Sequence, residues 1–233
     1  MVARYRPDHA KLNDCQHHGS GSGAELLLVE GDSALASVCA VRNPRTQAVL
    51  ALQGKPLNAW HASATRVAAH AQYQLLAQAL GLTTAAALAG AAGLAQPGPQ
   101  PLRYDRVVLL FDPDADGIHI GALLVLYVQR WLPWLIQRQQ LWQVRAPMFE
   151  LVAADSGEVL QADNPMYCQA LAERMAQAAG GARPRVQAYR GLGGIAPDVL
   201  RGRCVDPATR QAHAVVAADV QAVVDVFGGR PRA

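Results

Sequence analysis

The sequence predicts an α/β fold in which a mainly parallel β-sheet is flanked by helices, with a small C-terminal α+β extension. Short apolar runs at 26–29, 48–52 and 106–111 have the length and composition of buried strands. Segments with helical spacing follow them, and this alternation is typical of a parallel sheet covered on both faces. Acidic residues and glycines stand at the ends of two of the runs, which is where open α/β sheets bind ligands.

The composition indicates a globular protein and excludes a secreted or membrane-spanning one. Of 233 residues, 51% are hydrophobic and 17% charged, and the net charge of +3 permits a polyanionic partner without requiring one. The four cysteines form no C-x-x-C pair, so we expect free thiols and no zinc site. The N-terminus lacks the apolar core of a signal peptide, and Gln129, Arg130 and Pro133 interrupt the longest apolar stretch. We expect a cytoplasmic protein with no membrane partner.

The chain divides into three parts. Residues 1–23 are polar, end in a Gly/Ser-rich run and are expected to form a flexible connector. Residues 24–152 hold the main domain and residues 153–233 a C-terminal extension. Within the main domain, residues 83–100 are rich in Ala and Gly, which is typical of a low-complexity insertion or a weak helix.

The periodicity of the apolar residues places the other elements. Asp32 or Ser33 is the expected N-cap of the first helix. Further strands are expected at 142–145 and 149–152, and helices at 34–41, 62–80, from the acidic loop at 112–117 to about 137, and 166–179.

Three carboxylates at alternating positions, Asp112, Asp114 and Asp116, follow the clearest strand and precede Gly117. Carboxylates so close together repel one another unless a cation neutralises them, and Mg²⁺ prefers such oxygen ligands. A solvated acidic loop is the alternative. An EF-hand is excluded because the twelfth position of its loop would be Leu123 rather than Glu, and because a strand rather than a helix comes first.

Glu30 ends another strand and is followed at once by Gly31 and Asp32. This segment alone could be an ordinary strand-to-helix turn. If the two strands are parallel neighbours, however, Glu30 and the aspartates meet at one edge of the sheet. A metal ion beside a carboxyl group that exchanges a proton is what phosphoryl transfer requires.

Five segments, 11–15, 30–34, 54–58, 112–120 and 190–193, follow one another in an order that resembles the B subunits of type IIA topoisomerases, bacterial gyrase B and topoisomerase IV B. Segments 146–149 and 205–210 are also similar to strand and closing segments of that family. The resemblance covers nearly the whole chain and implies the TOPRIM fold of the family's DNA-cleavage region. The five segments named first carry the resemblance.

The resemblance also implies roles for single residues. Glu30 would be a metal ligand and the general acid/base at the 3′ oxygen of the scissile phosphate. Asp112 and Asp114 would bind Mg²⁺, with Asp116 supporting a second or shared metal position. For His119 a purely structural role is the alternative to a DNA contact. The residues expected to contact DNA are Lys55, Asn58, His119 and Arg190.

The family's ATP-binding and transducer domains precede this region, and the chain begins almost where they would end. None of its six tyrosines lies in a context that indicates a nucleophile. The expected partners are therefore DNA, a tyrosine-bearing A-type subunit and possibly a separate ATPase subunit.

Departures from the family pattern leave two other functions open. Leu35 and Ala36 replace two glycines, Gly121 replaces an Arg and Gly194 replaces a Glu. Loss of a basic residue weakens contacts with phosphate, so we expect weaker DNA binding than in a gyrase. The alternatives are a non-catalytic paralogue that binds topoisomerase subunits or DNA as a modulator, and a stand-alone TOPRIM nuclease that uses water as its nucleophile.

Overall fold

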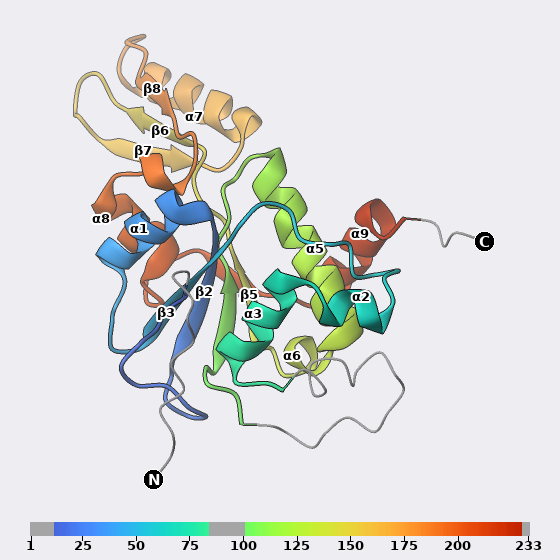
Figure 1. The fold of residues 1–233 in the computed structure, drawn as a ribbon. Coiled ribbons are helices and arrows are strands. Elements are labelled where there is room, and N and C mark those ends of the chain that lie inside the picture. The colour runs from blue at the N-terminus through green and yellow to red at the C-terminus, as the bar shows by residue number, and fades with distance from the viewer. Residues whose placement is uncertain (1–11, 84–100, 230–233) are drawn as a thin grey trace.

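The computed structural model describes residues 12–83 and 101–229. Their strands form a six-stranded sheet and a three-stranded sheet (Figure 1). The first sheet has the order β1-β3-β2-β4-β5-β9 and the second the order β7-β6-β8. The strands are β1 (Leu12–Asn13), β2 (Glu25–Glu30), β3 (Gln47–Leu52), β4 (Arg106–Leu109), β5 (Leu141–Val144), β6 (Phe149–Val152), β7 (Val159–Ala162), β8 (Arg185–Ala188) and β9 (Ala212–Ala214).

Helices cover both faces of the large sheet, with α1 and α8 on one side and α2, α3, α5, α6 and α9 on the other (Figure 1). The helical elements are α1 (Gly31–Val41), α2 (Ala64–Ala68), α3 (Ala71–Leu80), α5 (Ala115–Trp131), α6 (Trp134–Gln137), α7 (Pro165–Ala178), the 3₁₀ turn η2 (Leu192–Gly194), α8 (Pro197–Leu200), the π-helical turn η3 (Arg201–Val205) and α9 (Ala217–Phe227).

The four central strands are parallel, and β1 and β9 are antiparallel at the two edges. Their side chains alternate between the two cores. Leu26 and Leu28 of β2 belong to the core under α3 and α5, whereas Leu27 and Val29 belong to the core under α1. A strand that is buried on both faces needs apolar residues at every position, which is why the sequence shows a continuous run there. The predicted α/β fold is confirmed.

The connections change direction between β2 and β4. The chain leaves β2 through α1 to reach β3 on one side, and it leaves β4 through α5 to reach β5 on the other. Because α1 and α5 lie on opposite faces, the loops after β2 and β4 diverge. Such a switch point at the carboxyl ends of parallel strands is where open α/β sheets bind ligands.

The second sheet is antiparallel and packs against α7 through its own small core, centred on Leu151, Cys168 and Leu171. It projects from one end of the large sheet (Figure 1). The boundary predicted at residue 152 stays a prediction. β6, which ends there, already belongs to the second sheet, and β9 and α9 return to the first.

Three predicted helices differ from the structure. The first begins at Gly31, with Glu30 rather than Asp32 or Ser33 at the N-cap position. The segment 62–80 is two helices, because His70 adopts an extended backbone and its Nε2 accepts the N–H of Leu57. The helix after the acidic loop ends at Trp131, since Pro133 cannot donate to an earlier carbonyl, and α6 follows as a separate turn.

Residues 12–23 are not the flexible connector expected. Leu12 and Asn13 pair with β3, and Cys15 is buried in the core. The N–H groups of Gly21 and Gly23 donate to the carboxylate of Asp105. Strand pairing, burial of Cys15 and hydrogen bonds to Asp105 therefore all hold this polar segment. The insertion predicted at 83–100 lies outside the described residues, apart from Thr83.

Candidate metal centre

Glu30 and Asp112 lie at the carboxyl ends of the neighbouring strands β2 and β4. Glu30 is the last residue of β2, and Asp112 stands three residues beyond the end of β4. The two strands are parallel neighbours, and the N–H of Leu110 still donates to the carbonyl of Leu28 at 2.9 Å. Gly31 has φ +74°, a conformation that glycine adopts without strain, so the chain turns immediately after Glu30.

Burial is the main cause that raises the pKa of Glu30 above its usual value, and the negative charges of Asp112, Asp114 and Asp116 add to it. The ammonium group of Lys55 acts in the opposite direction. A carboxyl group with a raised pKa holds a proton more readily than a free carboxylate, as a general acid must. The same repulsion indicates a site that favours a cation.

The carboxyl group of Asp112 is half-buried, and burial raises its pKa. The N–H of Leu192 partly offsets this effect, because it donates to Oδ1 of Asp112 at 2.8 Å. Gly117, in the first turn of α5, lies so close behind the loop that a Cβ there would be 2.1 Å from the carbonyl oxygen of Asp112. The sequence needs glycine at this position for α5 to begin where it does.

Asp114 and Asp116 have different interaction partners from Asp112. Asp114 is the N-cap of α5 and its Oδ1 accepts the N–H of Gly117 at 2.9 Å. Asp116 is exposed and its Oδ1 lies 2.7 Å from Nζ of Lys55. The hydrogen bond and the charge of Lys55 lower the pKa of Asp116. The triplet predicted as a cluster is therefore spread over three environments.

A metal ion between Glu30 and Asp112 would need further ligands besides the carboxylates. Within residues 12–83 and 101–229, no three side chains of Asp, Glu, His or Cys lie close enough together to hold a metal ion by themselves. Mg²⁺ usually takes one or two carboxylates and completes its shell with water and substrate phosphate. Glu30, whose pKa the charge of Asp112 helps to raise, and the half-buried Asp112 fit that kind of site.

Comparison with known proteins agrees with this arrangement. Residues 25–140 match the family model of the Toprim domain. This range contains Glu30, Lys55, Asp112, Asp114 and Asp116. Residues 25–140 thus carry a match to the Toprim domain.

The Toprim domain and the segments around it are similar to the B subunits of type IIA topoisomerases. The chain is 34% identical over 201 residues to the B subunit of DNA topoisomerase 4 from Caulobacter vibrioides, covering 86% of this chain and 27% of that relative. The same identity and length of match are found with the topoisomerase 4 relative from Haemophilus influenzae, of which 29% is covered. The B subunit of DNA gyrase from Thermus thermophilus is 31% identical over 217 residues, 93% of this chain and 32% of that relative. The chain thus spans less than a third of these relatives' length.

The loop after β3 contacts the acidic loop through the ion pair between Lys55 and Asp116. Besides Lys55, it carries Gln53, whose Nε2 donates to Oδ1 of Asp32 at 2.8 Å. Gln72 of α3 also binds this loop, because its side-chain amide donates to the carbonyl of Gly54. The resemblance at 54–58 pointed to Lys55, whereas nothing in the sequence distinguished Gln53 or Gln72 from other surface glutamines.

The other residues predicted to contact DNA lie in two places. Nδ2 of Asn58 donates to the carbonyl of Phe227 in α9, and the ring of His119 stacks on the ring of Phe227 with centroids 5.3 Å apart. Arg190 is exposed, and no hydrogen bond or ion pair joins it to another described residue. All three assignments to DNA stay predictions.

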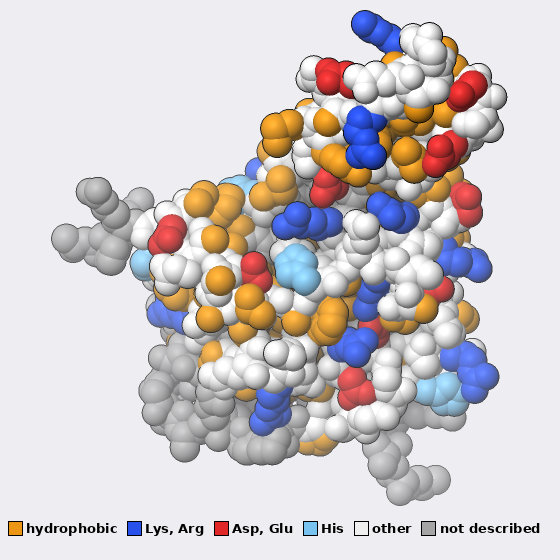
Figure 2. Space-filling view, turned by 180° about the vertical axis from the view of Figure 1, so that it is seen from behind, with side chains coloured by type: hydrophobic (Ala, Val, Ile, Leu, Met, Phe, Trp, Pro, Cys, Tyr) orange, Lys and Arg blue, Asp and Glu red, His pale blue; other side chains and the backbone are white. Residues whose placement is uncertain are grey.

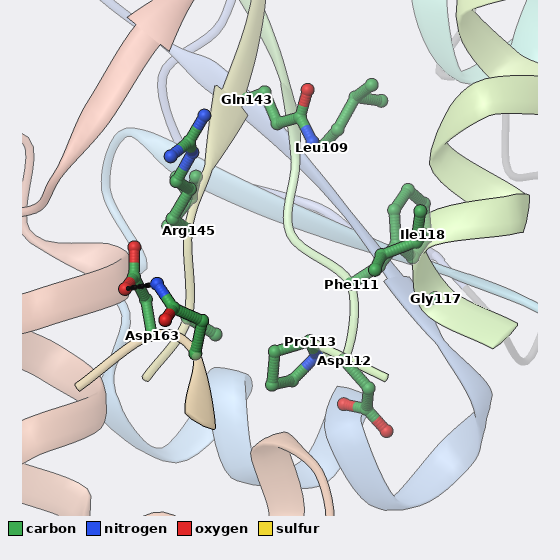
Figure 3. Close-up of a pocket in the computed structure, with 12 residues that line it drawn as sticks. Leu109, Phe111, Asp112, Pro113, Gly117, Ile118, Gln143, Arg145 and Asp163 are labelled. Carbon is green, nitrogen blue, oxygen red and sulfur yellow. Dashed lines mark hydrogen bonds between the residues drawn. The ribbon is translucent and has the colours of Figure 1, made fainter. Parts of the chain in front are cut away.

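A cavity of about 250 Å³ opens beside Asp112. Phe111 and Ile118 lie on one side of it, and Arg145 and Asp163 on the other (Figure 3). Asp112 stands at one end, with its carboxyl group directed away from Arg145 (Figure 3). Ile118 is 57% exposed, which leaves this wall of the cavity open to solvent.

The departures from the family pattern fall into different surroundings. Leu35 is buried in the core between α1 and the segment that carries Leu192. Gly121 is buried in α5, where a Cβ would meet only Phe111, at 3.7 Å. Gly194 faces open space. Only the Leu35 replacement adds packing next to the acidic turn.

Two further properties bear on where the protein can act. None of the described helices is long and apolar enough to cross a membrane. On the face opposite to that of Figure 1, the described Lys and Arg side chains stand among acidic and hydrophobic ones and form no continuous basic surface (Figure 2). A DNA-binding surface on this face would therefore depend on a few basic residues.

Proposed function

We propose that this chain is the Mg²⁺-dependent DNA cleavage and rejoining part of a type IIA topoisomerase. The observation that carries the proposal is the pair Glu30 and Asp112 at the ends of adjacent parallel strands, each with a raised pKa. The similarity to the B subunits of topoisomerase 4 and gyrase supports the same conclusion. We also propose that the chain consists of the three parts predicted from its sequence, with boundaries at residues 23 and 152.

Glu30 has the chemistry of a proton donor in this reaction. A tyrosine hydroxyl of the partner would attack the scissile phosphorus and lose its proton to solvent or a base of the partner. The bond from phosphorus to the 3′ oxygen breaks, and Glu30 gives its proton to that oxygen. The new tyrosyl phosphodiester keeps the bond energy, so the reverse reaction rejoins the strand and returns the proton to Glu30.

Asp112 and Asp114, with Glu30, would hold Mg²⁺, and Asp116 would stand ready for a second or shared position. When bound, the ion would supply positive charge to the transferring phosphate. Lys55, which pairs with Asp116, would contact a DNA phosphate. Asn58, His119 and Arg190 complete the proposed DNA contacts.

The proposed partners are DNA, an A-type subunit that supplies the tyrosine, and an ATPase subunit encoded separately or as part of the same protein. We place the protein in the cytoplasm with the DNA. The proposed partners supply what these residues do not, namely a nucleophile and a source of conformational energy.

The test mixes the purified chain with the A-type subunit of the same organism, Mg²⁺ and supercoiled plasmid, and traps covalent protein–DNA complexes with detergent. Glu30→Gln and Asp112→Asn are expected to lose cleavage by ~100-fold or more, the usual size of a general-acid effect. Asp32→Asn is the matched control, because it changes a neighbouring carboxylate that is bound to Gln53. It should cleave within about twofold of wild type by the same scale.

Two other outcomes would replace the proposal. Binding of the A-type subunit with no cleavage would indicate a modulator rather than a catalytic part, a result favoured by the spread of the aspartates over three environments. Metal-dependent cutting of plasmid by the chain alone would indicate a nuclease that uses water as its nucleophile.

A further inference from the structure

We infer that the turn 190–193 is a positioning element for Asp112, acting through the backbone of Gly191 and Leu192. The inference rests on the proposed function and adds residues to it. The turn lies about 80 positions along the chain from Asp112, yet Leu192 donates its N–H to Oδ1 of Asp112 at 2.8 Å. A backbone donor held in a folded turn fixes the rotamer of a carboxylate more firmly than a mobile side chain does.

Gly191 brings the turn against the other oxygen of the same carboxyl group. Its φ is +136°, a backbone conformation that other residues rarely adopt. A Cβ at this position would lie 2.4 Å from Oδ2 of Asp112 and 3.2 Å from its Oδ1. Glycine therefore permits an approach in which one oxygen takes the N–H and the other packs on the backbone, so that the carboxyl group cannot rotate away.

Gly193 places the same turn against the motif that carries Glu30. A Cβ on Gly193 would lie 2.5 Å from Oγ of Ser33, in the first turn of α1. Leu192, between the two glycines, is fully buried with Ala34 and Leu35 of α1. The turn thus contacts both acidic segments and sets the spacing between them.

The second sheet anchors the turn from its other side. The hydroxyl of Tyr189 donates to Oε2 of Glu150 in β6, and the N–H of Tyr189 donates to the carbonyl of Met148 at 2.8 Å. The position of Asp112 consequently depends on segments contributed by both sheets. A ligand shell assembled in this way is rigid before the cation arrives, which improves its affinity.

The test compares Gly191→Ala with Gly194→Ala by titrating each purified chain with Mn²⁺ and counting free ion by electron paramagnetic resonance. Gly191→Ala should weaken Mn²⁺ binding at least tenfold, because its Cβ displaces the Asp112 carboxyl group. Gly194→Ala adds its Cβ to open space and should bind within twofold of wild type. Equal binding by Gly191→Ala and wild type would overturn the inference.

A second measurement guards against a Gly191→Ala chain that does not fold. Hydrogen exchange of the Leu192 amide is followed in wild type and in Asp112→Ala, which keeps the turn unchanged. Protection of this amide in wild type, lost at least tenfold in Asp112→Ala while β4 stays protected, would support the contact. An unprotected Leu192 amide in wild type would overturn it. If wild type binds no Mn²⁺, the proposed function fails, and the exchange measurement still decides whether the turn holds Asp112.

Discussion

The three aspartates of the acidic loop differ in what holds their carboxyl groups. Asp112 accepts a backbone N–H from a distant turn, Asp114 caps the helix that follows it, and Asp116 pairs with Lys55. A single residue type repeated at every second position therefore gives one structural cap, one fixed carboxylate and one exchangeable ion pair.

Asp114→Ala should destabilise the fold even without metal, because it removes the N-cap of α5. Loss of such a cap typically costs about 1 kcal/mol of unfolding free energy. Asp116→Ala is the comparison, since its ion pair with Lys55 is largely exposed and should contribute much less than the N-cap. Urea denaturation in the presence of EDTA measures both. Equal losses in the two variants would contradict the distinction.

Asp14 should make stability depend on acid pH. Burial acts to raise its pKa, but the hydroxyl of Tyr104, at 2.6 Å, and the charge of Arg103 together hold the pKa below its usual value. A lowered pKa in the folded state means that the stabilisation is present above the usual pKa and is lost as the pH falls through the folded value.

Asp14→Asn should therefore lose about 1 kcal/mol at neutral pH, by the typical worth of a partly exposed charged hydrogen bond, and less at lower pH. Thermal unfolding from pH 7 to pH 2 measures the difference. Asp155→Asn, in the exposed loop after β6, is the control. A constant difference between Asp14→Asn and wild type across this range would show that the carboxylate charge does not contribute.

The sequence predicted the candidate carboxylates but not what holds them. Glu30 and Asp112 were found because acidic residues stand at strand ends, a local pattern. The N–H of Leu192 carries no such signal, since every residue other than proline has one and only the fold brings it to Asp112. The glycines at 191 and 193 were recognised as a motif, and their close packing explains why glycine is needed there.

Among the secondary-structure elements, β2 carries a buried ion pair at the end opposite Glu30. Both oxygens of Glu25 accept from Arg210, at 2.8 and 2.6 Å, and both side chains are 3% exposed. Gln47 of β3 donates to the same carboxylate at 3.1 Å and to the carbonyl of Val205 at 2.8 Å. This network ties the C-terminal segment to the start of the central strand.

Arg210→Met should cost about 3–5 kcal/mol of unfolding free energy, because it leaves the carboxylate of Glu25 buried and unpaired. Arg106→Met removes a weaker contact with Glu25, at 3.4 Å and 46% exposed, and should cost under about 1 kcal/mol. Urea denaturation at pH 7 compares the two. A similar loss in both would show that burial does not strengthen the Arg210 contact.

Element positions were predictable where one physical signal dominates. The strands β2, β3 and β4 fall where continuous apolar runs predicted them, within two residues. The helix at 62–80 was predicted as one because apolar spacing continues across it, whereas the break depends on a contact between His70 and Leu57 that lies outside the pattern. Residues 12–23 were expected to be flexible because the segment is polar and Gly/Ser-rich, whereas their order depends on contacts with distant residues that the pattern does not show.

In the whole molecule, the site is formed by segments that lie far apart in the sequence. β2, the loop after β3, the acidic loop and the turn 190–193 meet at one edge of the large sheet. The helix α9 then returns to the same region, where Phe227 contacts His119 and Asn58. The C-terminal segment therefore completes a surface that begins near the N-terminus.

Lys55 should contribute to DNA binding through charge rather than through base contacts. Lys55→Ala should weaken binding of unrelated duplexes alike and lower the slope of log K against log salt by about 1, as expected for one lost phosphate contact. Fluorescence anisotropy across a salt series measures both. Arg174→Ala, on α7 of the second sheet, is the matched control and should leave the slope unchanged. An unchanged slope in Lys55→Ala would remove it from the interface.

The role of Glu30 is tested most directly by cleavage of DNA that carries sulfur in place of the 3′ bridging oxygen at the scissile bond. A thiolate leaves without needing a proton, so the substitution bypasses a general acid. With Mn²⁺ and the A-type subunit present, sulfur should restore cleavage by Glu30→Gln by ~10-fold or more relative to oxygen. The sulfur substitution should not restore cleavage by Asp112→Asn. Equal impairment of Glu30→Gln on both substrates would contradict proton transfer by Glu30.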